Sequence, residues 1–255
     1  MSTAKLCQSH SKKPPKIAPV TGFMPPNLPI QPGELALVPL FANLEGEQHR
    51  RLLENHRLLT LEKDQQLILE QEESQGLFLL RSGLMKVRCM GMDGEETVLA
   101  LLGPGEVCGE MASLNPKGLR SADVITLTPC SLVIMRGGPF TTLLHSNPGL
   151  AISLAKLQAQ RLRDLNKRFS LRGADASSRM LATLAEIACK TFPDAPPTAA
   201  IPPIPHRELA NLSGLARETA SRILSNLRRR GEVAETADGG LQLTSLQPLE
   251  RRGLL

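Results

Sequence analysis

The chain has 255 residues, of which 41% are hydrophobic, enough for two modest domains or one large one. The net charge is +5, but Lys5, Lys12, Lys13 and Lys16 supply +4 of it within residues 1–33, which hold no Asp or Glu. The remainder is close to neutral, so nucleic-acid binding has to be argued from where Arg residues lie. Trp and Tyr are absent, which argues against the stacking platforms of single-strand and RNA binders.

The five cysteines are scattered, odd in number and without a CxxC pair or a Cys/His cluster. This pattern favours free thiols in a reducing compartment over a disulfide framework. No apolar segment near the N-terminus is long enough for a signal peptide, and no run approaches the roughly 18 apolar residues of a membrane span. We therefore expect a cytoplasmic protein with no membrane partner.

The first half of the chain changes its pattern twice. Residues 1–36 are rich in Pro, Lys and Ser, which predicts a disordered or extended tail. Residues 41–56 have the spacing of a short amphipathic helix. Short apolar runs separated by turn signals then follow, and many short strands at regular spacing predict a β-sandwich or jelly roll. The runs cover residues 58–61, 67–69, 77–80, 84–87, 98–102, 123–127 and 131–135.

Helical spacing returns over residues 140–171, where Arg161 interrupts one apolar face. A helix this long on a small β domain has an apolar seam left over, so we expect it to pair with a second copy of the chain. Packing within its own core alone is the alternative. A hinge over residues 172–175 and a further helix over 176–190 follow.

The stretch PHRELANLSGLARETASRILSNLRRRG, residues 205–231, predicts two short helices joined by a tight turn at Gly214, where a positive φ carries no steric cost. Guanidinium groups and a carboxylate on one face of the second helix are what a reader of the DNA major groove needs. A solvated polar face is the alternative. A hairpin over residues 232–244 completes a winged helix-turn-helix. The face consists of Arg217, Glu218, Ser221, Arg222 and Asn226.

A candidate ligand site lies within the predicted β domain, where a Glu precedes an Arg-Ser pair by ten residues. The carboxylate can accept a hydrogen bond from a sugar hydroxyl, while the Arg and Ser can bind a phosphate. The alternative is an ion pair in a roll that binds nothing. The candidate residues are Gly109, Glu110, Met111, Arg120, Ser121 and Ala122.

The segment RELANLSGLARETASRIL is similar to the DNA-binding element of the Crp/Fnr family of bacterial transcription regulators. The resemblance implies that Arg217, Glu218 and Arg222 read base edges, with Ser221 beside them. It also implies a homodimer, a palindromic DNA site and contact with RNA polymerase. Ala216 stands where the family often has Ser, and losing such an N-cap costs about 1 kcal/mol.

RSGLMKVR and GMDGEETVLALLGPGEVCGE resemble the double-stranded β-helix of cyclic-nucleotide-binding domains, and the candidate ligand site resembles the phosphate-binding cassette of cyclic-AMP receptor proteins. This implies cyclic AMP or another cyclic nucleotide as effector and no metal, with ribose on Glu110 and the cyclic phosphate on Arg120 and Ser121. Asp64 and Gln71 stand where the family commonly has Gly, so we expect less tight turns there.

In cyclic-AMP receptors a Thr–Ser pair from the paired helices contacts the adenine. The corresponding region here is about Asp164, Leu165 and Asn166, and it contains no Thr-Ser. Asp164 or Asn166 could hydrogen-bond a purine edge, so the identity of the base stays open.

The predicted fold class is α+β, and the predicted function is a dimeric, sequence-specific DNA-binding transcription regulator that is not an enzyme. Alternatives are a Crp/Fnr-type regulator with no ligand, or with a redox or gas effector through an iron–sulfur cluster or a haem. A cupin-like metal enzyme is a further alternative, although the β domain lacks His. The expected parts are a tail (1–36), a cyclic-nucleotide-binding-like β-roll (37–139), a dimerisation helix (140–172) and a winged helix-turn-helix domain (173–255).

Overall fold

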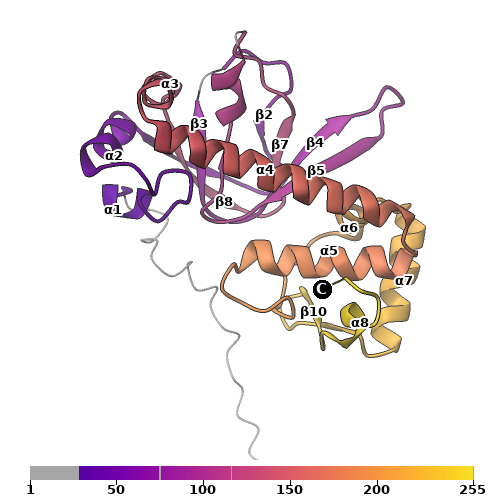
Figure 1. The fold of residues 1–255 in the computed structure, drawn as a ribbon. Coiled ribbons are helices and arrows are strands. Elements are labelled where there is room, and N and C mark those ends of the chain that lie inside the picture. The colour runs from indigo at the N-terminus through magenta and orange to yellow at the C-terminus, as the bar shows by residue number, and fades with distance from the viewer. Residues whose placement is uncertain (1–28, 75, 116, 255) are drawn as a thin grey trace, which may run out of the picture.

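The computed structural model describes residues 29–74, 76–115 and 117–254 (Figure 1). Residues 1–28 of the expected tail lie outside this part. Residues 29–36 were also assigned to the tail, but they include α1 (Pro32–Leu35), in which Leu35 is fully buried. Glu34 forms an ion pair with Arg81 at 3.1 Å, out of water. The folded part therefore begins before residue 37, and the boundary expected there was too late.

The first amphipathic helix is shorter than the apolar spacing predicted. α2 spans Gly46–Leu53, because Glu45 caps its start and donates its backbone N–H to the Gln48 side chain at 3.0 Å. Phe41 precedes this helix and packs edge-on against Phe140, with ring centroids 6.3 Å apart. Phe41 and its apolar neighbours therefore lie in turns before α2, and their side chains reach the core from there.

Two four-stranded antiparallel sheets form the predicted roll, and their inner side chains share one core. One sheet has the order β1 (Arg57–Leu61), β8 (Cys130–Met135), β3 (Leu77–Ser82), β6 (Val107–Cys108). The other has the order β2 (Gln66–Ile68), β7 (Asp123–Thr126), β4 (Met85–Met90), β5 (Glu96–Leu102). Sequence reasoning missed β6, since two residues leave no periodicity to detect.

Asp64 and Gln71 adopt the left-handed backbone conformation, with φ of 62° and 65°. The expectation of less tight turns was therefore wrong: these side chains occupy a conformation that usually favours glycine. A non-glycine residue there costs on the order of 1–3 kcal/mol.

We expect Gln71→Gly to raise the free energy of unfolding by about 0.5–1 kcal/mol, because glycine takes this φ without a Cβ clash. Gln71 is exposed, so no packing is lost. Urea denaturation measures the effect. Glu72→Gly at the next exposed position, outside the left-handed region, is the control and should lower stability.

The helix expected over residues 140–171 is in fact two helices, α3 (Gly137–Ser146) and α4 (Pro148–Ser170). Asn147 ends the first and caps the second, accepting the backbone N–H of Leu150 at 3.0 Å. Pro at the first helical position after such a cap is a common helix start. This signal was present in the sequence and should have placed the break.

The C-terminal part matches the expected winged helix-turn-helix. Gly214 ends the first helix of the motif with φ of 60°, and Ala216 starts the second without a side-chain cap. The elements are α5 (Ala176–Thr191), α6 (His206–Ser213), α7 (Arg217–Arg229), β9 (Val233–Glu235), β10 (Leu241–Leu243) and α8 (Gln247–Glu250).

Figure 1 shows α4 running across the roll to reach the helix-turn-helix. The two parts also share a hydrophobic core. Four buried roll residues, Leu84, Val98, Leu101 and Leu127, cluster with buried residues of α5, α6 and α7. The side of the roll formed by β4 and β5 is thus in contact with the helix-turn-helix part.

Candidate functional site

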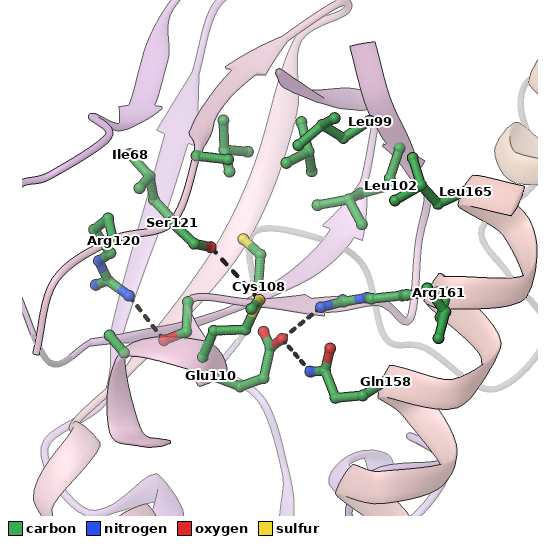
Figure 2. A pocket seen from close by; sticks show the side chains of 18 residues that line it. Ile68, Leu99, Leu102, Cys108, Glu110, Arg120, Ser121, Gln158, Arg161 and Leu165 are labelled. Carbon is green, nitrogen blue, oxygen red and sulfur yellow. Dashed lines mark hydrogen bonds and ion pairs between the residues drawn. The ribbon is translucent and has the colours of Figure 1, made fainter. Parts of the chain in front are cut away.

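A cavity of about 380 Å³ lies between the sheet that contains β4 and β5 and the helix α4 (Figure 2). Its volume is in the range of small-molecule sites. One part is apolar, lined by Ile68, Val87, Leu99, Leu102, Val124 and Leu165. The other contains the polar residues Glu110, Arg120, Ser121, Gln158 and Arg161.

The cassette begins with a turn that only glycine fits. Gly109 has φ of 86° and precedes a short 3-10 helix over Glu110–Leu114. A Cβ at Gly109 would lie 2.5 Å from the Nη1 of Arg120 and 2.6 Å from the carbonyl oxygen of Gly76. The absence of a side chain therefore lets the Arg120 guanidinium lie against the backbone where Glu110 begins.

Glu110 is almost fully buried, and two side chains of α4 hold one of its carboxylate oxygens. Gln158 Nε2 donates to Oε1 at 2.7 Å, and Arg161 Nη1 forms an ion pair with the same atom at 2.6 Å. Arg161 also donates to the carbonyl oxygen of Val107. No hydrogen bond to Oε2 occurs among the described residues, so that oxygen can accept one from a ligand.

Arg120 is 3% exposed and is held from three sides. Its Nη1 donates to the Gly109 carbonyl at 2.8 Å, and its Nη2 to the Gly76 carbonyl at 2.9 Å and to Ser74 Oγ at 3.1 Å. The guanidinium lies 5.6 Å from the ring centroid of Phe78. Burial lowers the pKa of Arg120, yet a guanidinium stays charged in proteins. Three of its five N–H donors are used, which leaves two for an anion.

The other cassette residues, Met111, Ser121 and Ala122, also line the cavity. Ser121 Oγ contacts the Met111 sulfur at 3.5 Å, and Ala122 lies beside it in sequence. Cys108 forms part of the same wall, and burial raises the pKa of its thiol to about 12. At neutral pH this group is therefore an uncharged, largely apolar part of the lining.

Asp164 and Asn166 are exposed and do not line the cavity of their own chain. Asp164 instead accepts a hydrogen bond from Gln160 at 2.8 Å. Leu162 and Leu165 face the cavity in their place, because they follow Gln158 and Arg161 on the same side of α4. The two residues proposed from the sequence as purine contacts are therefore separate from the rest of the predicted site.

Sequence reasoning missed Gln158 and Arg161 as members of the site. In the sequence, Arg161 is visible only as a charged residue that interrupts an apolar helix face. A charged residue on such a face needs a buried partner, and this was the available signal.

The predicted DNA-reading residues Arg217, Glu218 and Arg222 are all exposed on the first two turns of α7. Ser221 lies between them, half-buried, with its Oγ 3.3 Å from Nδ1 of His206. On the opposite face Ala220, Leu224 and Leu227 are fully buried. The helix therefore turns its polar side to solvent, as a helix that enters a DNA major groove must.

The fold and two family matches identify a DNA-binding transcription regulator with a cyclic-nucleotide-binding domain. The family model for the cyclic nucleotide-binding domain matches residues 58–147, and the model for the Crp-like helix-turn-helix domain matches residues 178–252. The chain belongs to the Crp/Fnr family of transcription regulators.

Two relatives illustrate this membership. The cyclic AMP receptor protein of Thermus thermophilus is 31% identical over 196 residues, 76% of this chain and 88% of the relative. The cAMP-activated global transcriptional regulator CRP of Pasteurella multocida is 30% identical over 166 residues, 63% of this chain and 78% of the relative.

Solved structures share the fold. FixK2 from Bradyrhizobium japonicum has a TM-score of 0.67 at 21% identity, over 77% of this chain and 96% of that one. The c-di-GMP responsive regulator CLP of Xanthomonas campestris has a TM-score of 0.63 at 22% identity, over 79% and 100%.

Two further observations concern the described residues. Among them, no group of three or more His, Cys, Asp or Glu side chains is arranged to hold a metal ion. No helix in the same part combines the length and apolar character that crossing a bilayer requires.

Proposed function

We propose that this protein is a homodimeric regulator whose affinity for a palindromic DNA site is controlled by cyclic AMP or another cyclic nucleotide, without catalytic activity of its own. The observation that carries the ligand assignment is that a buried carboxylate and a buried guanidinium line one cavity. Glu110 Oε2 would accept the ribose 2′-hydroxyl, and the two remaining donors of Arg120, with Ser121, would bind the cyclic phosphate. Metal plays no part in this scheme.

The purine would lie in the apolar part of the cavity, against Leu162 and Leu165. These side chains offer dispersion contacts but no hydrogen bond to a base edge. Asp164 and Asn166 would reach a purine only across a dimer seam. The lining of the cavity therefore favours neither adenine nor guanine through a hydrogen bond of its own.

A dimer is supported by apolar side chains of α4 that the roll leaves uncovered. Leu150 and Leu154 are buried against the roll, whereas Ile152, Leu162 and Phe169 remain 55%, 59% and 69% exposed. A second α4 packed along this side would bury them. Two recognition helices would then lie one DNA turn apart on half-sites like TGTGA, next to RNA polymerase in the bacterial cytoplasm.

One observation favours a ligand-free regulator as a second candidate. Arg120 already donates three hydrogen bonds, to Gly109, Ser74 and Gly76, and Glu110 is already paired with Arg161. Such contacts could simply hold the roll together. Binding measurements separate the two candidates.

Calorimetry of the purified protein should show heat with cyclic AMP, and the comparison with cyclic GMP tells which purine the apolar part accepts. With 2′-deoxy cyclic AMP, we expect binding weaker by about 1.5–3 kcal/mol, because a hydrogen bond to the Glu110 carboxylate is lost. No heat with either nucleotide, in protein that still binds a palindromic duplex, would favour the ligand-free candidate.

A further inference from the structure

A buried ion pair joins the roll to the DNA-binding part. Lys86 of β4 has its Nζ 2.5 Å from Oε1 of Glu96 in β5 and 2.5 Å from Oε2 of Glu208 in the first turn of α6. The side chains of Lys86 and Glu208 are only 4% and 5% exposed. The charges therefore meet out of water, 122 residues apart in sequence.

The roll holds its half of this contact in place. Arg88 forms ion pairs with Glu96 at 2.7 Å and with Asp123 at 3.3 Å. Asp123 in turn accepts the backbone N–H of Glu70 at 2.8 Å. Although burial opposes it, hydrogen bonds and charges from Lys86 and Arg88 lower the pKa of Glu96, so this carboxylate stays ionised at neutral pH. Lys86 thus projects from a fixed network.

Stability alone does not account for such a pair. Desolvation of two charges offsets most of their attraction, and apolar residues of similar volume often stabilise a buried site as well or better. The surrounding core already supplies apolar contact between the two parts. That contact is non-directional, whereas the charge-assisted hydrogen bond from Lys86 to Glu208 favours one orientation.

The orientation that the pair fixes is open to DNA. Glu208 lies on α6, whose Leu209 and Leu212 are buried in the same core as Leu224 and Leu227 of α7. Fixing α6 therefore fixes the recognition helix. In this arrangement Arg217, Glu218 and Arg222 are exposed, so the reading face is not covered by the roll.

We propose that Lys86 is a positioning residue for DNA binding. Through Glu208 it holds the helix-turn-helix on the roll in a DNA-competent orientation, and it contacts no DNA itself. Its neighbour Val87 points the other way and lines the ligand cavity. One strand thus presents consecutive residues to the cavity and to the helix-turn-helix.

The test measures affinity for a duplex that the wild-type protein selects from a random pool, at several salt concentrations. We expect Lys86→Met to weaken DNA binding about tenfold, which is the size of effect seen for residues that couple two sites without contacting the ligand. The salt dependence of DNA binding should not change, because Lys86 contacts no phosphate. Arg50→Met is the matched control, because Arg50 is in an exposed ion pair with Glu47, and it should bind as wild type.

Unchanged affinity in Lys86→Met would overturn the proposal. A salt slope reduced by about one would also overturn it, because it would reveal a phosphate contact. Lys86→Met leaves the buried Glu208 with only the exposed Arg207 as an ion-pair partner, at 3.5 Å, whereas Glu96 keeps its ion pair with Arg88. A double variant, Lys86→Met with Glu208→Leu, therefore removes both charges of the pair that joins the two parts. We expect it to melt no lower than wild type and still to bind DNA about tenfold more weakly. Wild-type DNA affinity in the double variant would mean that apolar packing alone sets the orientation. A melting temperature well below that of the wild type would mean that the ion pair serves stability.

Discussion

Replacing Arg120 with Met should weaken cyclic nucleotide binding by about 2–5 kcal/mol, because the phosphate would lose its charged partner in a buried site. The same change removes hydrogen bonds to the carbonyl groups of Gly76 and Gly109, so the melting temperature should also fall. Calorimetry and thermal denaturation of the same preparation measure both effects.

Ser74→Ala is the matched control for this variant. Ser74 contacts Arg120 at 3.1 Å but does not line the cavity. We expect it to lower stability slightly and to leave ligand binding unchanged. Wild-type affinity in folded Arg120→Met protein would remove Arg120 from the phosphate site.

Replacing Arg222 with Ala should cost about 1–3 kcal/mol on the preferred duplex and relax the base preference at one position. Arg222 is exposed on α7, so the fold and the melting temperature should not change. Fluorescence anisotropy with the preferred and a random duplex, at one fixed salt concentration, measures the ratio of the two affinities.

Arg229 lies two turns further along the same helix and is also exposed. We expect Arg229→Ala to change the two affinities by the same factor, because the N-terminal residues of a recognition helix contact base edges and Arg229 lies in the last turn of α7. Equal losses on both duplexes in Arg222→Ala would contradict its role as a base reader.

The helix-turn-helix could be predicted from the sequence because its signals are local. The glycine turn, the polar face and the buried face of α7 all fall within residues 205–231, and the structure has both helices of the motif within this stretch. The strands of the roll other than β6 were predicted for the same reason. The break before Pro148 was also encoded locally, although the apolar spacing on both sides hid it.

The two buried charge clusters could not be predicted, because their members are distant in sequence. Arg161 and Glu110 are 51 residues apart, and Lys86 and Glu208 are 122 apart. No periodicity connects such positions, and a buried Lys on a strand looks in sequence like an exposed one. Only the packing of α4 and α6 on the roll brings these side chains together.

Strand β5 contributes side chains to both parts of the molecule: Leu99 and Leu102 line the cavity beside α4, while Val98 and Leu101 pack with the DNA-binding helices. Melting of either part exposes a surface of the same strand. The described part of the chain should therefore denature as one cooperative unit, with a single calorimetric transition. A ligand bound in the cavity would then slow hydrogen exchange in α5 and α6, which it never touches.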